Sequence, residues 1–150
     1  MANDLVFDWY GTLWSPGAPD GKDAEGIHPA LIAKLKYLYS QGIEMAIISN
    51  TNRATATSYM REKLASLGIL HLFSVVVGSA TIGIQKPDRD LFTLVAKFFN
   101  RQPHNIVMIG DSDATDGGAR QVGWKFKKVQ TGTASIWVNQ LNDVAELTTT

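Results

Sequence analysis

Seven residues with side chains suited to chemistry stand at or just beyond the ends of short apolar runs, or at the start of a helical pattern. They are Asp8, Ser49, Asn50, Lys86, Asp111, Asp113 and Asp116. Carboxylates placed together repel one another unless a cation lies among them, and hard oxygen ligands near a phosphate favour Mg²⁺. A lysine and small polar donors can hold the oxygens of a phosphoryl group. The set therefore indicates a site for Mg²⁺ and a phosphoryl group, if the fold brings these residues together.

The elements that must position these residues are predicted from the pattern of apolar residues. Strands are expected at residues 5–7, 45–48, 73–77, 106–109 and, with lysines interleaved, 124–129. Short apolar, partly β-branched runs of this kind are typical of strands buried on both faces of a parallel sheet. Helices are expected at residues 27–41, 54–67, 87–99, 118–122 and 133–147. This alternation predicts βαβ units and a doubly wound α/β sheet, in which ligands bind at the carboxyl ends of the strands.

One helical pattern also predicts which side chains enter the core. In the helix expected at residues 87–99, the inward residues should be Leu91, Leu94, Val95 and Phe98. A polar loop rich in proline and glycine, residues 15–26, is expected after the first strand.

The composition limits the class of protein. The 150 residues suit one domain, residues 1–150, large enough to bury a core. Lys plus Arg and Asp plus Glu both number 14, so no general attraction to nucleic acid or to an anionic membrane is expected. The absence of cysteine excludes disulfides, thiolate metal sites and a cysteine nucleophile. With neither a secretory signal nor a long apolar run in the sequence, we expect a cytoplasmic protein without a membrane span.

Four motifs occur in order along the chain. They are residues 8–13 (Asp-Trp-Tyr-Gly-Thr-Leu), residues 48–50 (Ile-Ser-Asn), Lys86-Pro87 before a helix, and residues 110–112 (Gly-Asp-Ser) with Asp116. This set resembles the haloacid dehalogenase superfamily, whose members are mostly hydrolases of phosphate esters, and the resemblance covers about residues 4–129. It implies a Rossmann-like three-layer sandwich with a five-stranded parallel sheet in the order 5-4-1-2-3.

The resemblance also implies roles for individual residues. Asp8 would be the nucleophile that forms an aspartyl-phosphate, with Tyr10 and Lys86 as the other catalytic residues. Mg²⁺ would be held by Asp8, the backbone carbonyl of Tyr10, Asp111 and Asp116. The phosphoryl group would be bound by Gly11, Thr12, Ser49, Asn50 and Lys86. In the fourth motif, alignment on Asp111 selects Asp116 as the second carboxylate, whereas alignment on Gly118 would select Thr115, and Asp113 is a further substitute.

Tyr10 departs from the family pattern, which usually has a second aspartate there as general acid and base. Such help is worth ~10²–10⁴-fold in rate, and a tyrosine, with an ordinary pKa of about 10, is a poor base at neutral pH. Three interpretations follow: a slow Mg²⁺-dependent phosphohydrolase, an inactive phosphate- and metal-binding interaction protein, or a metal-independent enzyme of the 2-haloacid dehalogenase type. The acidic fourth motif favours phosphate chemistry over dehalogenation.

The spacing of the motifs leaves no room for a cap domain. Residues 14–26 alone separate the first motif from the first helix, and one helix and one strand fill the space between Asn50 and Lys86. We therefore expect an uncapped site that accepts a bulky phosphorylated substrate, or a site covered by a neighbouring subunit in a homo-oligomer.

Overall fold

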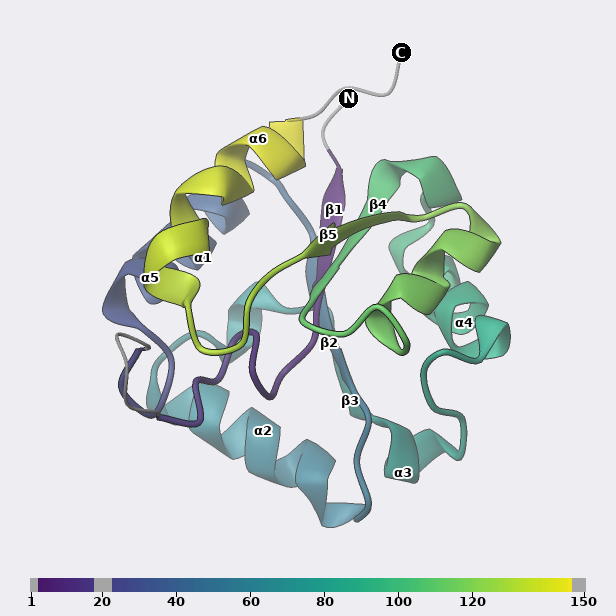
Figure 1. The fold of residues 1–150 in the computed structure, drawn as a ribbon, viewed down its shortest axis with the longest axis horizontal. Helices are drawn as coiled ribbons and strands as arrows, with labels where there is room; N and C mark the ends of the chain where they lie inside the picture. The colour runs from purple at the N-terminus through teal and green to yellow at the C-terminus, as the bar shows by residue number, and fades with distance from the viewer. Residues whose placement is uncertain (1–2, 18–22, 147–150) are drawn as a thin grey trace.

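A parallel sheet with helices on both faces forms the framework of the chain (Figure 1). The computed structural model describes residues 3–17 and 23–146. The strands are β1 (Asp4–Phe7), β2 (Met45–Ser49), β3 (Val75–Gly78), β4 (Ile106–Gly110) and β5 (Lys125–Lys128). The helices are α1 (Pro29–Ser40), α2 (Thr55–Ser66), α3 (Ser79–Ile82), α4 (Arg89–Phe99), α5 (Ala134–Trp137) and α6 (Leu141–Glu146). The described residues also form 3₁₀ helices at Leu70–Leu72, Pro103–Asn105, Asp116–Val122 and Val138–Gln140.

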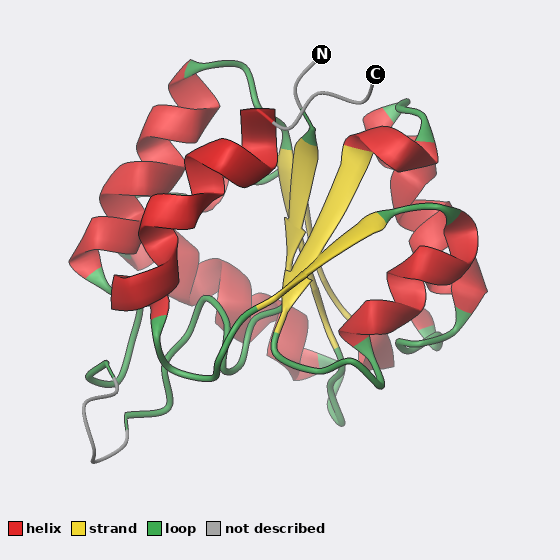
Figure 2. Cartoon of the chain, turned by 45° about the horizontal axis from the view of Figure 1, so that its top comes forward, coloured by secondary structure: helices red, strands yellow, loops and turns green. Residues whose placement is uncertain are grey.

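The strand order is β3-β2-β1-β4-β5, and every neighbouring pair is parallel. This is the predicted order 5-4-1-2-3 counted from the other edge, so the fold prediction is confirmed. Phe7 at the end of β1 is in register with Ile47 of β2 and Ile109 of β4. The chain segments that follow these three strands therefore leave the sheet side by side, along the lower edge in Figures 1 and 2.

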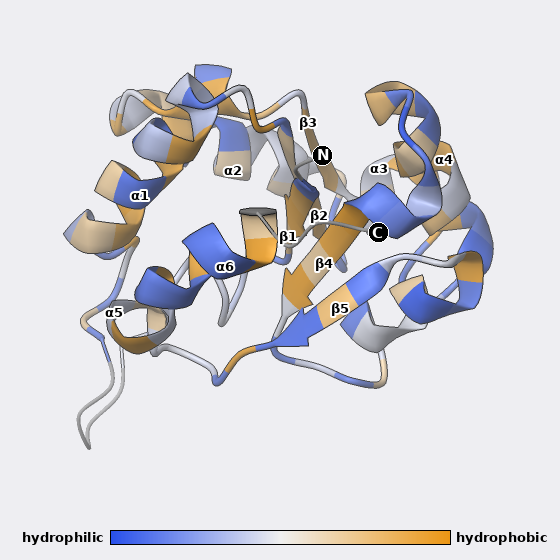
Figure 3. Cartoon of the chain, turned by 90° about the horizontal axis from the view of Figure 1, so that it is seen from above, coloured by the Kyte–Doolittle hydropathy of each residue, from blue (hydrophilic) through white to orange (hydrophobic). Residues whose placement is uncertain are grey.

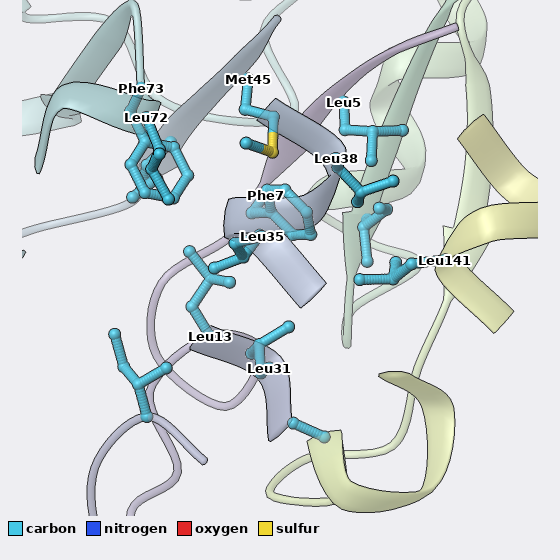
Figure 4. Close-up of a cluster of buried hydrophobic side chains, with 14 of the residues drawn as sticks. Leu5, Phe7, Leu13, Leu31, Leu35, Leu38, Met45, Leu72, Phe73 and Leu141 are labelled. Carbon is cyan, nitrogen blue, oxygen red and sulfur yellow. The ribbon is translucent and has the colours of Figure 1, made fainter. Parts of the chain in front are cut away.

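Two apolar layers cover the two faces of the sheet, because alternate residues of a strand point to opposite faces. On one face, Leu5 and Phe7 pack with side chains from α1, α2 and α6, as Figure 4 shows for part of this cluster. On the other face, Val6 packs with α4 and with the 3₁₀ helix Asp116–Val122. Figure 2 shows the sheet edge-on between the two helical layers.

Helix α4 meets the sheet along a different stripe from the one predicted. Its buried residues are Leu91, Phe92, Val95 and Phe99. The predictions for Leu94 and Phe98 were wrong, since these side chains are 37% and 64% exposed. The ring of Phe92 instead packs edge-to-face against Trp124, with ring centroids 5.3 Å apart.

Two further differences concern short elements. The C-terminal segment expected as one helix is divided into α5, a 3₁₀ turn and α6. The single-turn helix α3, directly after β3, has too few residues to show an apolar period and was not predicted. The other helices lie within two residues of the expected bounds at each end.

Hydropathy is distributed as expected for a sheet buried on both faces. Figure 3 shows apolar colouring along β4, whereas the edge strand β5 is largely hydrophilic because of its lysines. Charged side chains on an edge strand oppose pairing with other chains. Within the described part of the chain, no helix is long and apolar enough to cross a membrane.

Candidate active site

The loop after β1 places Asp8 at the carboxyl edge of the sheet. The N–H of Asp8 donates to the carbonyl of Ile109 in β4 at 2.9 Å, which continues the pairing of the two strands for one more residue. Beyond it, the N–H groups of Thr12 and Trp14 both donate to the carbonyl of Trp9, at 3.2 and 2.9 Å. The chain therefore turns back at once, and the side chain of Asp8 is held beside β4.

Two glycines let carboxylates approach the backbone closely. A Cβ on Gly110, the last residue of β4, would lie 2.1 Å from Oδ2 of Asp116. A Cβ on Gly11 would lie 2.3 Å from Oδ2 of Asp111, and Gly11 has a φ of +84°, which favours glycine. Larger residues at these two positions would displace the carboxylates, so both glycines are part of the site's construction.

Three carboxylates lie close together, and two of them contact one buried ammonium group. Asp8, Asp111 and Asp116 each present a carboxylate oxygen, and these atoms all lie within 4.8 Å of one another. The Nζ of Lys86 donates to Oδ1 of Asp8 at 3.1 Å and to Oδ1 of Asp116 at 2.6 Å. It also donates to the carbonyl of Ile48 at 2.8 Å. Since the Lys86 side chain is 1% exposed, these contacts are largely shielded from water.

Burial raises the pKa values of Asp8 and Asp116, two of the three carboxyl groups. Loss of hydration is the main cause of the rise in the pKa of Asp8 to about 7; the neighbouring carboxylates add to it and Lys86 opposes it. Burial likewise raises the pKa of Asp116, again against the effect of Lys86. When all three carboxyl groups are ionised, their negative charge exceeds the positive charge of the Lys86 ammonium group that contacts the cluster.

The main chain of Lys86 is fixed by Asn50. The N–H of Lys86 donates to Oδ1 of Asn50 at 2.8 Å, and Nδ2 of Asn50 donates back to the carbonyl of Lys86 at 2.9 Å. Next along the chain, Pro87 packs so closely on Gly118 that a Cβ there would lie 2.6 Å from Cβ of Pro87. Because both ends of the Asn50 amide are engaged, the structure gives Asn50 a positioning contact; its predicted phosphate contact stays a prediction.

The other predicted phosphate ligands lie at the same edge. Ser49 is the last residue of β2 and is buried. Thr12 is buried as well, and its Oγ1 has no hydrogen-bond partner among the described residues. The N–H of Gly11 donates to the carbonyl of Trp14 at 2.8 Å, so this turn uses the N–H groups of both Gly11 and Thr12 internally. Tyr10 is 61% exposed and does not fill the core.

Asp113 lies outside the carboxylate cluster. Its side chain is 56% exposed and accepts from Lys128 at 2.6 Å, with Arg120 at 3.5 Å. The hydrogen bond from Lys128 is the main cause of the lowered pKa of Asp113. Between Asp113 and Asp116, the structure therefore brings only Asp116 to the site among the residues that it describes.

Thr131 was not identified from the sequence. Its Oγ1 donates to Oδ2 of Asp111 at 2.7 Å, and it lines a cleft of about 400 Å³ together with Asp111 and Lys128. The one signal in the sequence is that Thr131 follows the fifth strand, whose carboxyl end lies on the same edge as the other site residues.

Comparison of the sequence with known proteins finds relatives among phosphatases. The family profile described as haloacid dehalogenase-like hydrolase matches residues 25–129. The phosphoserine phosphatase of Thermus thermophilus is 33% identical over 115 residues, which are 76% of this chain and 41% of that protein. A phosphoglycolate phosphatase of Cereibacter sphaeroides is 30% identical over 100 residues, which are 67% of this chain and 43% of that protein. The chain thus spans less than half the length of these relatives.

Solved structures share the fold over the whole chain. A protein from Corynebacterium glutamicum superposes with a TM-score of 0.75 and 20% identity, covering 100% of this chain and 99% of that one. A HAD-superfamily hydrolase from Ehrlichia chaffeensis gives a TM-score of 0.72 and 18% identity, covering 95% and 97% of the two chains. At these low sequence identities, the superpositions show only that the fold is shared. The family match, which spans Ser49, Lys86, Asp111 and Asp116, carries the assignment: the chain belongs to the haloacid dehalogenase-like hydrolases.

Proposed function

We propose that this chain is a Mg²⁺-dependent phosphohydrolase that acts through an aspartyl-phosphate on Asp8. The proposal is carried by the cluster of three carboxylates, two of which pair with the ammonium group of Lys86. The donors suit a hard divalent cation, because carboxylate oxygens are its preferred ligands and the excess negative charge needs a counter-ion. Asp8, Asp111 and Asp116, with the main-chain carbonyl of Tyr10, would hold Mg²⁺. When bound, Mg²⁺ would supply positive charge for the oxygens of the phosphoryl group.

The chain's own residues would perform two displacements at phosphorus. A carboxylate oxygen of Asp8 attacks the phosphorus, and the bond from phosphorus to the ester oxygen breaks as the leaving alcohol takes up a proton. Water then attacks the same phosphorus, the bond to Asp8 breaks, and inorganic phosphate leaves. Lys86, whose Nζ lies 3.1 Å from Oδ1 of Asp8, would stabilise the charge on the phosphoryl oxygens.

The exposed phenol of Tyr10 determines how fast we expect the aspartyl-phosphate to be hydrolysed. It stands two residues after the nucleophile and can donate a proton to the leaving group, but it is a poor base for activating water. We therefore propose slow hydrolysis of the aspartyl-phosphate. The same residue supports the second candidate, a protein that binds Mg²⁺ and phosphate without turnover.

The surroundings of the site support a bulky phosphorylated substrate. The described residues between Leu13 and α1 form a loop, which is closed by pairing of Ser15 with Gly26. Between β2 and Lys86 lie α2, β3 and the short α3. We propose that residues 1–150 act as one domain without a cap, so that the site is open to large phosphate esters.

Hydrolysis of an aryl phosphate tests the proposal. Wild type, Asp8→Asn and Asp113→Asn are compared with Mg²⁺ and with a chelator. Asp113, an exposed aspartate in the loop after β4, is the control outside the cluster. We expect Mg²⁺-dependent turnover in wild type and Asp113→Asn, and none in Asp8→Asn. Equal activity in Asp8→Asn and wild type would refute the role of Asp8.

Two further outcomes identify the alternatives. Mg²⁺ binding in calorimetry without turnover on a broad panel of phosphate esters would favour the binding protein. Halide release from 2-haloacids in the presence of chelator would favour a dehalogenase.

A further inference from the structure

We infer that Thr131 is a positioning residue, which fixes the orientation of the Asp111 carboxylate toward a divalent cation. The inference rests on the proposed function, because the cation site is part of it. Thr131 Oγ1 donates to Oδ2 of Asp111 at 2.7 Å. Within residues 3–17 and 23–146, no other hydrogen-bond donor contacts this carboxylate.

Asp111 differs in this respect from the other two carboxylates of the cluster. Asp8 and Asp116 are both oriented by the ammonium of Lys86, and Asp116 also accepts from the N–H of Ser112 at 3.2 Å. Asp111 makes no ion pair with Lys86. The hydroxyl of Thr131 therefore orients the Asp111 carboxylate, as Lys86 orients those of Asp8 and Asp116, but it adds no positive charge.

The hydrogen bond uses one oxygen and leaves the other for the cation. Oδ2 of Asp111 is held between Thr131 and the backbone of Gly11, where a Cβ would lie 2.3 Å away. Oδ1 keeps its lone pairs, since among the described residues it accepts no hydrogen bond. A carboxylate fixed at one oxygen presents the other in a defined direction, which lowers the entropy lost when a cation binds.

The loop that carries Thr131 is fixed to the elements that carry the site. On one side, the N–H of Val129 donates to the carbonyl of Gly110 at 3.0 Å. On the other side, the N–H of Gly132 donates to the carbonyl of Gly11 at 3.0 Å. Thr131 is thus held between the end of β4 and the turn after β1, and its hydroxyl is placed by the backbone on both sides.

Mg²⁺ affinity of the metal-free protein tests this inference by calorimetry. Thr131→Val removes the hydroxyl at nearly constant volume, Thr131→Ser restores it, and Thr93→Val makes the same change at an exposed position of α4. Loss of a partner that orients a ligand weakens metal binding ~10–100-fold. We expect a weakening of this size in Thr131→Val, and affinities close to wild type in Thr131→Ser and Thr93→Val. If Thr131→Val does not fold, Thr131→Ala gives the same test.

The outcomes separate this inference from the proposed function. Unchanged Mg²⁺ affinity in Thr131→Val or Thr131→Ala, beside wild-type protein that binds Mg²⁺ and needs Asp8 for turnover, would overturn the role of Thr131 alone. Weakening to the same degree in Thr131→Ser would also overturn it, because the hydroxyl would then not matter. Wild-type protein without Mg²⁺ affinity would overturn both the inference and the proposed function.

Discussion

Lys86→Met removes the positive charge on which two buried carboxylates depend. The Lys86 side chain is 1% exposed, and its Nζ lies 3.1 Å from Asp8 and 2.6 Å from Asp116. Methionine is flexible and similar in length, so it fills most of the same space. The substitution therefore tests the charge rather than the packing.

The expected loss of stability is large. Removal of one partner of a buried ion pair costs about 3–5 kcal/mol, because the remaining charge is left without compensation. For a chain of this size, each kcal/mol lowers the melting temperature by about 2–4 °C, which gives a decrease of roughly 6–20 °C. The loss should be largest above neutral pH, where both carboxyl groups are ionised, and smaller in acid, where either one takes up a proton.

Thermal unfolding in chelator, followed by circular dichroism at pH 5 and pH 8, measures the effect. Lys36→Met, on the exposed side of α1, is the matched control and should melt close to wild type. The double variant Lys86→Met/Asp116→Asn should regain part of the loss, since it removes one of the unpaired charges. If Lys86→Met melts within about 2 °C of wild type at pH 8, less than 1 kcal/mol for a chain of this size, the electrostatic account of this site is refuted.

Three further predictions concern neighbouring positions. In chelator, the free energy of unfolding of wild type should decrease as the pH rises from about 4 to about 7. Burial raises the pKa of Asp8 from 3.8 to about 7, so over this range the folded state holds a proton that the unfolded chain has released. Urea unfolding at a series of pH values should show a weaker dependence of this free energy on pH in Asp8→Asn. Tyr10→Asp should raise aryl phosphate turnover by up to ~10²–10⁴-fold, and no gain would show that a carboxylate there is not what is missing. Gly110→Ala should lower the free energy of unfolding in urea by about 1–3 kcal/mol, since its Cβ would lie 2.1 Å from Oδ2 of Asp116. Gly117→Ala is the control and should be tolerated, because the nearest atom to its Cβ would be 3.6 Å away. Equal stabilities of these two variants would contradict the steric argument.

Much of the fold was predictable because the strands are buried on both faces. Their apolar runs stand out against the helical patterns, and the resemblance to a known family supplied the strand order, which periodicity alone does not give. The need for a carboxylate favoured Asp116 over Thr115 but left Asp113 as a substitute; the structure places Asp116 in the carboxylate cluster and Asp113 at the surface.

The failures concern contacts between residues far apart in sequence. Apolar side chains lie on more than one face of α4, so the helical period of the sequence does not decide whether Phe98 or Phe99 faces the sheet. The residue that packs on Phe92, Trp124, belongs to a later segment of the chain. Thr131 belongs to no motif, and its role follows only from the return of the loop after β5 to the end of β4. Both contacts join residues far apart in sequence, and the position of Thr131 after the fifth strand does not by itself indicate its partner.

Because Lys86 already pairs with two of the clustered carboxylates, the chain does not need a metal ion in order to fold. In zinc fingers and many other small metal-binding domains, metal binding supplies the free energy of folding, and a chelator denatures the chain. Here the ammonium of Lys86 is a counter-ion that the chain itself supplies, already paired with Asp8 and Asp116. The chain would therefore fold whatever the Mg²⁺ supply, and under the proposed function a change in that supply would alter the rate of catalysis rather than the amount of folded protein.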